Sequence, residues 1–493
     1  MIRTKFFHLL WCAFVAITLV SFHAGDSLGQ NNGGGGGGGG DGGGGGDGGG
    51  GGAGRGADEP YNPNPFAPAG IEVDAAGVLR MRLFHDPTGQ LTKQRLAQTQ
   101  GQMDPNLIRP SELRKVSLNR LERALARTLA DTGTIPEDMR YLAGMTRLKY
   151  AFFFPETNDI VIAGPAEGYV EDLSGRAVGL SSGQSVLELQ DLIVALRSFP
   201  PFGDPTPVIS CSIDPTQEGL QRMQQFLVQM AGNIQPSDAN RVAAGLRQQL
   251  GLQTVTIGGI PPTSHFAQVL VEADYRMKLI GIGLESPAVK IKSYVARANP
   301  SQVARNAMQR WYFVPDYKRI RVSEDGLAME LVGGGVQLVD EDQMVTADGN
   351  RSVSTRVNRA SRAFVREFTQ KYDQLAEHSP VFAQLRNLID MSVAAAYLQN
   401  EDYYGKAGWA MRVLGNESLV SVENQQAPTH VESAVNIVWK GNRLMTPIGG
   451  GVNIQPQLAL NSDVMLDDED GSLDATRQQV NVGEFDEQIW WWD

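Results

Sequence analysis

A glycine tract near the N-terminus of this chain of 493 residues is the sequence feature that most limits which part of the chain can fold. Eighteen of the 20 positions from Gly33 to Gly52 are glycine, and the two exceptions are aspartates. Such a segment has no apolar side chains to bury and a large backbone entropy to lose, so it cannot build a core. We therefore expect a disordered tether over residues 30–70, first glycine-rich and then proline-rich, and a folded body after it.

The residues before the glycine tract are typical of a secretory signal peptide. Arg3 and Lys5 precede a mostly apolar run, Phe6–Phe22, and small or polar residues follow it. The run is short for a transmembrane helix, which needs about 20 apolar residues. We expect cleavage between Gly29 and Gln30, which predicts an exported chain, periplasmic or extracellular, that keeps no transmembrane segment.

Export and composition together limit how the chain folds and what it binds. Of its two cysteines, only Cys211 follows the predicted cleavage site, so the exported chain has no intramolecular disulfide and must fold by core packing. The net charge is −12 for the whole chain. An acidic excess argues against duplex nucleic acid as the partner, because binding to its phosphates requires a basic surface.

The clearest local pattern predicts a β-α-α-β-α unit in a mixed sheet. The apolar and polar residues of Val208–Ile213 alternate, which indicates a strand, and Asp214 is placed to cap the helix that follows. A second helix is expected over Asp238–Leu250, a strand over Gln253–Ile260 and a third helix over Ser264–Ile280. The fold class that this pattern favours is α+β.

Shorter elements are expected on both sides of this unit. They are two strands within Ile71–Phe84, helices Glu112–Ala130 and Leu189–Phe199, a hairpin within Leu148–Ala163, an antiparallel meander over Gln309–Asp342, a helical pair Arg362–Ala376 and Val381–Gln399, and β segments beyond Trp409. We therefore predict five parts. These are a signal peptide (1–29), the tether (30–70), an α/β-type domain (71–300), a β-meander and helical-pair domain (301–462) and an acidic tail (463–493).

Four segments carry a resemblance to a known family: Ile162–Gly168, Ser210–Thr216, Gly258–Ile280 and Asp325–Leu331. They resemble an exported family of planctomycete-type bacteria known as a domain of unknown function, and the resemblance extends over roughly residues 75 to 450. It implies export. It implies no activity, cofactor or catalytic residue, so the candidate sites below come from the residues themselves.

The best candidate for a polar site is one stripe of the third helix. His265, Gln268, Glu272 and Arg276 recur at helical spacing beside its apolar face. The alternative is a solvent-exposed face whose opposite charges pair four residues apart. Cys211 and His265 begin consecutive β-α connections and suggest a nucleophile and a base. However, Cys211 alternates with isoleucines along its strand, which indicates a buried side chain.

Metal and cofactor motifs are missing from the sequence. Four histidines follow the predicted cleavage site, and none has another histidine or a cysteine at metal-ligand spacing. No zinc site built from histidine and cysteine, and no cofactor, is therefore predicted.

Two further regions are candidates for binding. Residues 289–322 carry eight basic side chains among aromatic ones, including Trp311, Arg319 and Arg321, which would suit an anionic polymer, although solvated strand faces would explain the same pattern. Residues 463–493 carry ten acidic side chains and one arginine. We expect this tail to dock on the basic region or on a partner, with its terminal tryptophans as anchors. These are Trp490, Trp491 and Trp492.

The hypothesis that these observations favour is an exported, non-catalytic binding or assembly module of the cell envelope. Its expected partner is an envelope protein or an anionic polymer. The alternative is an extracytoplasmic hydrolase that uses His265 and Glu272, with Cys211 as a further candidate.

Overall fold

The structure is a computed structural model. It describes residues 68–83, 90–91, 94–95, 101, 103–172, 174–230, 235–298, 310–316, 320–340, 343–345, 351–353, 358–436, 438–440, 443–445, 450–480, 482–484 and 486–493. The predicted signal peptide and almost all of the tether lie outside these ranges. The described residues form an α+β fold with mixed sheets, as predicted.

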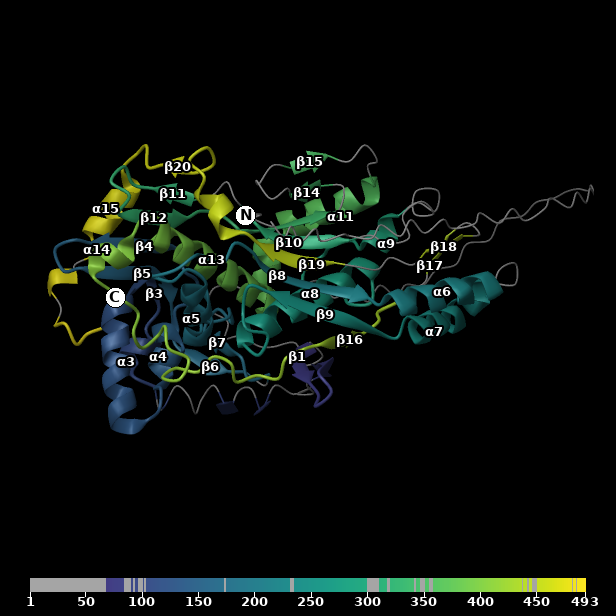
Figure 1. Cartoon of the computed structure of the whole chain (residues 1–493), viewed down its shortest axis with the longest axis horizontal. Helices are drawn as coiled ribbons and strands as arrows, with labels where there is room; N and C mark the ends of the chain where they lie inside the picture. Colours follow the sequence, from purple (N-terminus) through teal and green to yellow (C-terminus); the bar gives the residue numbers. More distant parts are fainter. Residues whose placement is uncertain are drawn as a thin grey trace, which may run out of the picture.

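Two large sheets make up the framework of the described residues (Figure 1). The strands of the first are β1 Pro68–Val73, β2 Val78–Leu83, β8 Ile209–Pro215, β9 Leu252–Gly258, β10 Trp311–Pro315, β13 Val336–Asp340, β16 His430–Glu432 and β19 Gly451–Ile454. The strands of the second are β3 Ser111–Ser117, β4 Tyr150–Phe154, β5 Asp159–Ala166, β11 Ile320–Val322, β12 Ala328–Leu331, β20 Leu466–Asp467 and β21 Trp491–Trp492. Their orders are β1-β2-β16-β9-β8-β19-β10-β13 and β20-β11-β12-β4-β5-β3-β21.

The predicted division into domains at residue 300 does not divide these sheets. In the first sheet, β8 pairs with β19, and β19 pairs in turn with β10. In the second sheet, β4 from the N-terminal half pairs with β12 from the C-terminal half. The strands before and after residue 300 satisfy one another's backbone hydrogen bonds, and one continuous apolar core lies beneath both halves. The prediction of two separate domains is therefore wrong for the described residues.

The predicted meander is also divided between the two sheets. β10 pairs antiparallel with β13 in the first sheet, whereas β11 pairs antiparallel with β12 in the second. The chain returns from β12 to β13 through a glycine-rich turn, in which Gly333 and Gly335 have φ values of 87° and 73°. This left-handed conformation strains residues with a Cβ atom, so the glycines allow the return to the first sheet. Local alternation shows strands, but it does not show which sheet they join.

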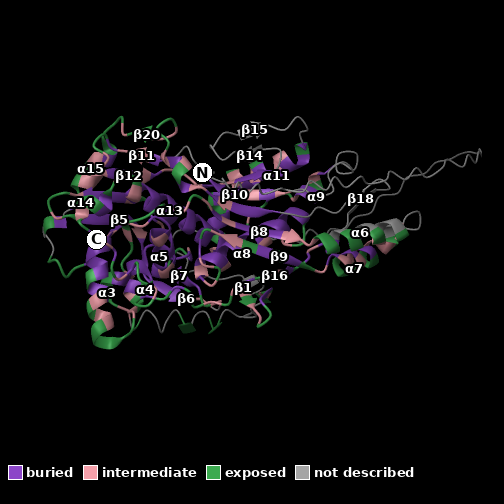
Figure 2. Ribbon diagram, in the orientation of Figure 1, coloured by how far each residue is buried: buried purple, intermediate pink, exposed green. Residues whose placement is uncertain are grey.

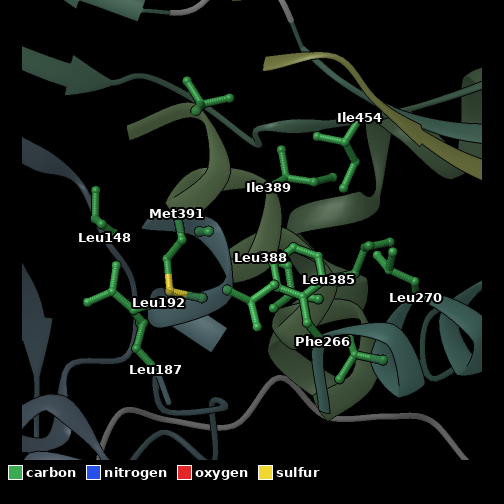
Figure 3. Packing of buried hydrophobic residues seen from close by; sticks show 14 of the residues in the cluster. Leu148, Leu187, Leu192, Phe266, Leu270, Leu385, Leu388, Ile389, Met391 and Ile454 are labelled. Carbon is green, nitrogen blue, oxygen red and sulfur yellow. The ribbon is translucent and has the colours of Figure 1, made fainter. Parts of the chain in front are cut away.

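Helix α13, Pro380–Asn400, lies between the two sheets (Figure 1). Eighteen of its 21 residues are buried. The sequence pattern predicted apolar residues on one side only, but the helix is buried on all sides. It contacts α5, Leu189–Ser198, and α8, His265–Ile282. Figure 3 shows Leu385, Leu388 and Ile389 of α13 among apolar side chains of the neighbouring elements. Neighbours on several sides therefore make α13 the centre of the core.

The β-α-α-β-α unit is present as predicted, in the order β8, α6, α7, β9, α8. Its first strand runs on through Pro215, so α6 begins later than predicted, at Gln217, and ends at Met230. Thr216 rather than Asp214 caps α6, because its Oγ1 accepts the Gly219 N–H at 3.0 Å. Helix α7, Ala239–Leu250, ends at Gly251 as predicted and carries many exposed residues (Figure 2).

The helix predicted over Glu112–Ala130 begins later than expected. Its first residues form strand β3, and α3 covers only Leu118–Thr132. β3 lies between β5 and β21, and the hydrogen bonds to these two strands outweigh the local spacing of Leu113 and Val116 that resembles a helix. The first helix of the predicted pair is also divided, into α11, Arg359–Gln370, and α12, Tyr372–His378.

The acidic tail is part of the folded body. β20 pairs with β11 at Arg321, and β21 pairs with β3, so the tail forms both edges of the second sheet. Trp490 and Trp492 are 6% and 5% exposed. The tail does contact the predicted basic region, through the pairing of β20 with Arg321, but the tryptophans are not the anchors of that contact, because they pack on the β3 side of the chain. Among the described residues, we find no helix with both the length and the apolar character that crossing a membrane requires.

Candidate functional site

A cavity of about 620 Å³ lies beside the first turns of α5 and α8. Its wall includes His265, Gln268 and Glu272 of α8, and Glu188 and Gln190 at the start of α5. The segment 420–425 and strand β1 also contribute residues. A cavity of this size has room for a small molecule and its hydration water.

The local sequence at the start of α8 places His265 at the cavity. Ser264 is fully buried, and its Oγ accepts the Ala267 N–H at 3.2 Å and donates to the Pro261 carbonyl at 2.7 Å. This cap fixes where the helix begins and makes His265 its first residue. Glu188 occupies the corresponding cap position of α5, and Asp191 lies in the first turn of that helix.

Each ring nitrogen of His265 lies near one carboxylate. Nδ1 of His265 lies 3.0 and 2.9 Å from the two carboxylate oxygens of Asp191. Nε2 lies 3.7 Å from Oε1 of Glu188, which is beyond hydrogen-bond distance. The other oxygen of Glu188 accepts a hydrogen bond from Gln190 Nε2 at 2.6 Å. Among the described residues, His265, Asp191 and Glu188 form the group whose histidine and carboxylate atoms lie close enough to share a metal ion.

Burial and charge act in opposite directions on these groups. Burial alone would favour a neutral imidazole, but the negative charges of Asp191 and Glu188 outweigh it and raise the pKa of His265 to about 9. Burial raises the pKa of Glu188, and the neighbouring His265 opposes this increase. As the structure stands, His265 carries a positive charge at neutral pH.

A second set of buried charges continues from the cavity wall into the protein. The Arg176 guanidinium forms an ion pair with Glu272 and donates through Nε to the Gln384 side chain at 2.8 Å. Glu272 is 1% exposed and also lies 3.8 Å from Arg276, which forms two hydrogen bonds with Glu285. The attraction between these paired charges offsets part of the desolvation penalty of burying them.

Two exposed arginines are among the residues that line the cavity. They are Arg82 of β2 and Arg140 of α4, Glu137–Arg140. Neither forms an ion pair with a residue that the structure describes. Their guanidinium groups are therefore free to bind an anion that enters the cavity.

The structure brings together three of the four residues of the predicted polar stripe. His265, Gln268 and Glu272 line the cavity, whereas Arg276 does not and is instead paired with Glu285. The opposite charges on the helix do pair at a spacing of four residues, as expected. The alternative of a solvent-exposed face is wrong, because Asp274 and Glu272 have almost no exposed surface.

Cys211 is not part of the site. It is 2% exposed in β8 and shares its buried face with Ile209 and Ile213, as the alternation indicates. Burial raises the pKa of the thiol well above its usual value, which keeps it protonated and unreactive. It does not line the cavity, so the structure separates it from His265.

The other predicted binding residues that the structure describes do not line the cavity. Trp311 is 1% exposed, and its Nε1 donates to Ser361 Oγ at 3.0 Å, so it is a core residue. Arg321 pairs with Glu330 at 2.6 Å. Trp491 lies beneath the Arg114 guanidinium at 4.8 Å. Arg319 and two other basic residues of 289–322 lie outside the described residues.

The residues that complete the site, Glu188, Asp191 and Arg176, were missed by the sequence analysis. Asp191 is 74 positions from His265, and an acidic residue in a first helical turn usually serves only the helix. The helix over Leu189–Phe199 and the start of the third helix near Ser264 were both predicted. The missing information was that the first turns of these two helices adjoin.

One family model is similar to a part of the chain that includes some of the site residues. A family model described as a protein of unknown function (DUF1598) matches residues 211–294. This match confirms the predicted resemblance to a domain of unknown function over that span, which contains His265 and Glu272 but neither Glu188 nor Asp191. No curated protein and no solved structure is significantly similar to the chain.

Proposed function

We propose that this chain is an exported binding protein whose cavity takes a small anionic molecule that also carries hydroxyl groups. One observation supports this proposal above the others: a cavity of about 620 Å³ is lined by two exposed arginines that have no ion-pair partner among the described residues. Arginine binds carboxylate, phosphate and sulfate groups through paired hydrogen bonds. The amide groups of Gln190, Gln268 and Asn424, which line the same wall, are suited to hydroxyl groups.

The chemistry of this wall favours a unit of an acidic polysaccharide. Such a unit has one carboxylate for the arginines and several hydroxyl groups for the amides. Export is part of the same proposal and is supported by the signal-peptide pattern of residues 1–29. An acidic polymer of the cell envelope would then be the partner, and the chain would bind one of its units.

The hydrogen bonds of His265 favour binding over nucleophilic catalysis. Its imidazole hydrogen-bonds to Asp191 and to no hydroxyl or thiol among the described residues. A serine or cysteine nucleophile would need such a contact with its base. Cys211, the only thiol among the described residues, is buried elsewhere.

A hydrolase remains the second candidate, with water as the nucleophile. The observation in its favour is the cluster of titratable groups with shifted pKa values in a cavity wall, which is typical of acid and base catalysts. The structure changes the expected pair of residues. Glu188 lies beside His265, whereas Glu272 is paired with Arg176.

Titration with galacturonate and with galactose tests the proposal, since the two sugars differ in the carboxylate. We expect galacturonate to raise the melting temperature and galactose to have little effect. Stabilisation by a ligand at a hundredfold excess over its Kd is about 2.7 kcal/mol. The variants Arg82→Gln and Arg140→Gln should each lower galacturonate affinity about tenfold, which is the loss of one charged hydrogen bond.

Both arginines are exposed, so these variants should melt at the wild-type temperature without ligand. Equal stabilisation by both sugars, or unchanged affinity in the two variants, would contradict the proposal. Release of monomer from digalacturonate that is lost in His265→Ala would favour the hydrolase.

A further inference from the structure

We infer that the wall of this cavity binds a divalent transition-metal ion through Nε2 of His265 and Oε1 of Glu188. The inference deepens the proposed function and rests on it in one respect: the ion would face the cavity and meet the anionic ligand there. The donor set differs from the zinc motifs that the sequence lacks, because it combines one histidine with carboxylates that come from a different helix.

The distance between the two ligand atoms fits a shared ion. Nε2 of His265 and Oε1 of Glu188 are 3.7 Å apart. Bonds from zinc to histidine nitrogen and to carboxylate oxygen are each about 2.0–2.2 Å, so two ligands of one ion lie about 3–4 Å apart at usual bond angles. A direct hydrogen bond would bring these atoms closer, to about 3 Å.

Both ligands are already held in orientation by neighbouring groups. Asp191 accepts a hydrogen bond from Nδ1 of His265 and so directs Nε2 towards Glu188. Gln190 donates to the other oxygen of Glu188 at 2.6 Å, which leaves Oε1 for the ion. Histidine ligands in metal sites commonly have such a carboxylate on the second ring nitrogen, and ligating carboxylates are hydrogen-bonded in the same way.

The charges around the cavity wall also favour a divalent cation. Two carboxylates contact the imidazole, and two others pair with two guanidinium groups. Once an ion has replaced the imidazole proton, these groups together carry two more negative than positive charges. A buried excess of two negative charges is costly, and a divalent ion compensates it. The members of the set are Glu188, Asp191, Glu272, Glu285, Arg176 and Arg276.

The cavity leaves room for further ligands of the ion. The side chain of His265 is 18% exposed and faces the cavity, so water or a ligand oxygen can complete the coordination. Two protein ligands with open positions predict moderate affinity. A nitrogen and oxygen donor set suits zinc, cobalt or manganese better than copper(I), which prefers sulfur.

Metal titration of the full chain tests the inference. After treatment with EDTA, calorimetry with Zn²⁺ and the visible absorption of Co²⁺ should both show one ion per chain. His265→Ala and Glu188→Gln should lower the affinity at least about a hundredfold, and Asp191→Asn, which changes only the orienting group, about 10–100-fold. His378→Ala is the matched control, since His378 is an exposed histidine away from the cavity, and it should bind as the wild type does.

A spectroscopic measurement on the wild type keeps the test valid if a variant fails to fold. In ¹⁵N spectra of the imidazole groups, Zn²⁺ should shift Nε2 of one histidine, and Asp191→Asn should change that signal. Absence of stoichiometric binding, or binding that survives in His265→Ala and disappears in His378→Ala, would overturn the inference.

The same samples separate this inference from the proposed function. Galacturonate that binds equally well with Zn²⁺ and with EDTA would overturn the prediction that the ion meets the ligand, while the proposed function would stand. Zn²⁺ that binds at His265 in a chain to which galacturonate does not bind at all would leave the metal site and reject the ligand.

Discussion

Burial determines what individual charged residues do in this protein. Asp274 on α8 is fully buried, and its Oδ2 lies 3.0 Å from Lys278 Nζ, which also donates to the Ile213 carbonyl at 3.1 Å. Burial raises the pKa of Asp274 to about 6, although Lys278 opposes the increase. The pair therefore holds α8 against β8, and it does so with a carboxylate that takes up a proton more easily than usual.

This pair predicts a dependence of stability on pH. The usual pKa of Asp274 is 3.8, so between about pH 4 and pH 6 the folded chain binds a proton that the unfolded chain has lost. The stability from this proton is fully present below the unfolded pKa and is lost as the pH rises through about 6. As the pH rises from about 4 to about 6, we expect the free energy of unfolding of the wild type to fall by about 1–3 kcal/mol relative to that of the double variant Asp274→Asn/Lys278→Met.

The double variant removes both charges at once, so it leaves no unpaired charge in the core. Urea unfolding at a series of pH values measures the difference between the two proteins. Curves that stay parallel from about pH 4 to pH 6 would contradict the raised pKa.

At the scale of elements, the start of α8 links the fold to the site. Ser264 is buried and caps the helix, and the next residue is His265. The same kind of cap occurs at α9, Tyr294–Arg297, where Ser293 Oγ accepts the Ala296 N–H at 3.2 Å. These two serines perform the same local task, but only the first is next to the cavity.

Replacing each serine with alanine should therefore separate stability from binding. We expect Ser264→Ala to lower the free energy of unfolding by about 1–2 kcal/mol, because it removes the cap, and to weaken Zn²⁺ and galacturonate binding as His265 shifts. Ser293→Ala should cost about 1 kcal/mol and leave both affinities unchanged. Denaturant unfolding measures the change in stability, and calorimetry measures the two affinities. If both variants changed the affinities equally, the position of the first residue of α8 would not matter for binding.

At the scale of the whole molecule, the tail closes the second sheet at both edges. β20 and β21, which form these edges, both come from residues 463–493. Arg114, which is fully buried, donates to four backbone carbonyls and to the Asp493 carboxylate. Trp492 packs in a small core with Phe152 and Leu473. The tail thus makes both outer strands of the second sheet only two residues long, and such short edge strands offer other chains little backbone to pair with.

Loss of these contacts should destabilise the whole body. We expect Trp492→Ala to lower the free energy of unfolding by about 3–5 kcal/mol, as large buried aromatic residues do. Gln488→Ala, at an exposed position of the same tail, should change it by less than about 0.5 kcal/mol. Chemical denaturation measures both variants, and similar small effects would show that the tail is only loosely attached.

Local patterns predicted most individual elements correctly. The β-α-α-β-α unit, the hairpin β4–β5 and helix α5 all follow from spacing, turn residues and caps, which act over a few residues. The helix predicted from Glu112 was wrong at its start, because long-range pairing with β5 and β21 made that segment a strand. The meander was wrong for the same reason, since its two hairpins join different sheets.

By itself, the sequence determined the α+β class, the position of most helices and strands, and a polar stripe on α8 that includes His265. These are decided by interactions between neighbours along the chain. Only the tertiary structure decided which strands share a sheet, that the tail belongs to the body, and that Glu188 and Asp191 lie beside His265. These outcomes depend on packing between segments far apart in sequence, and no local pattern of side chains specifies that packing.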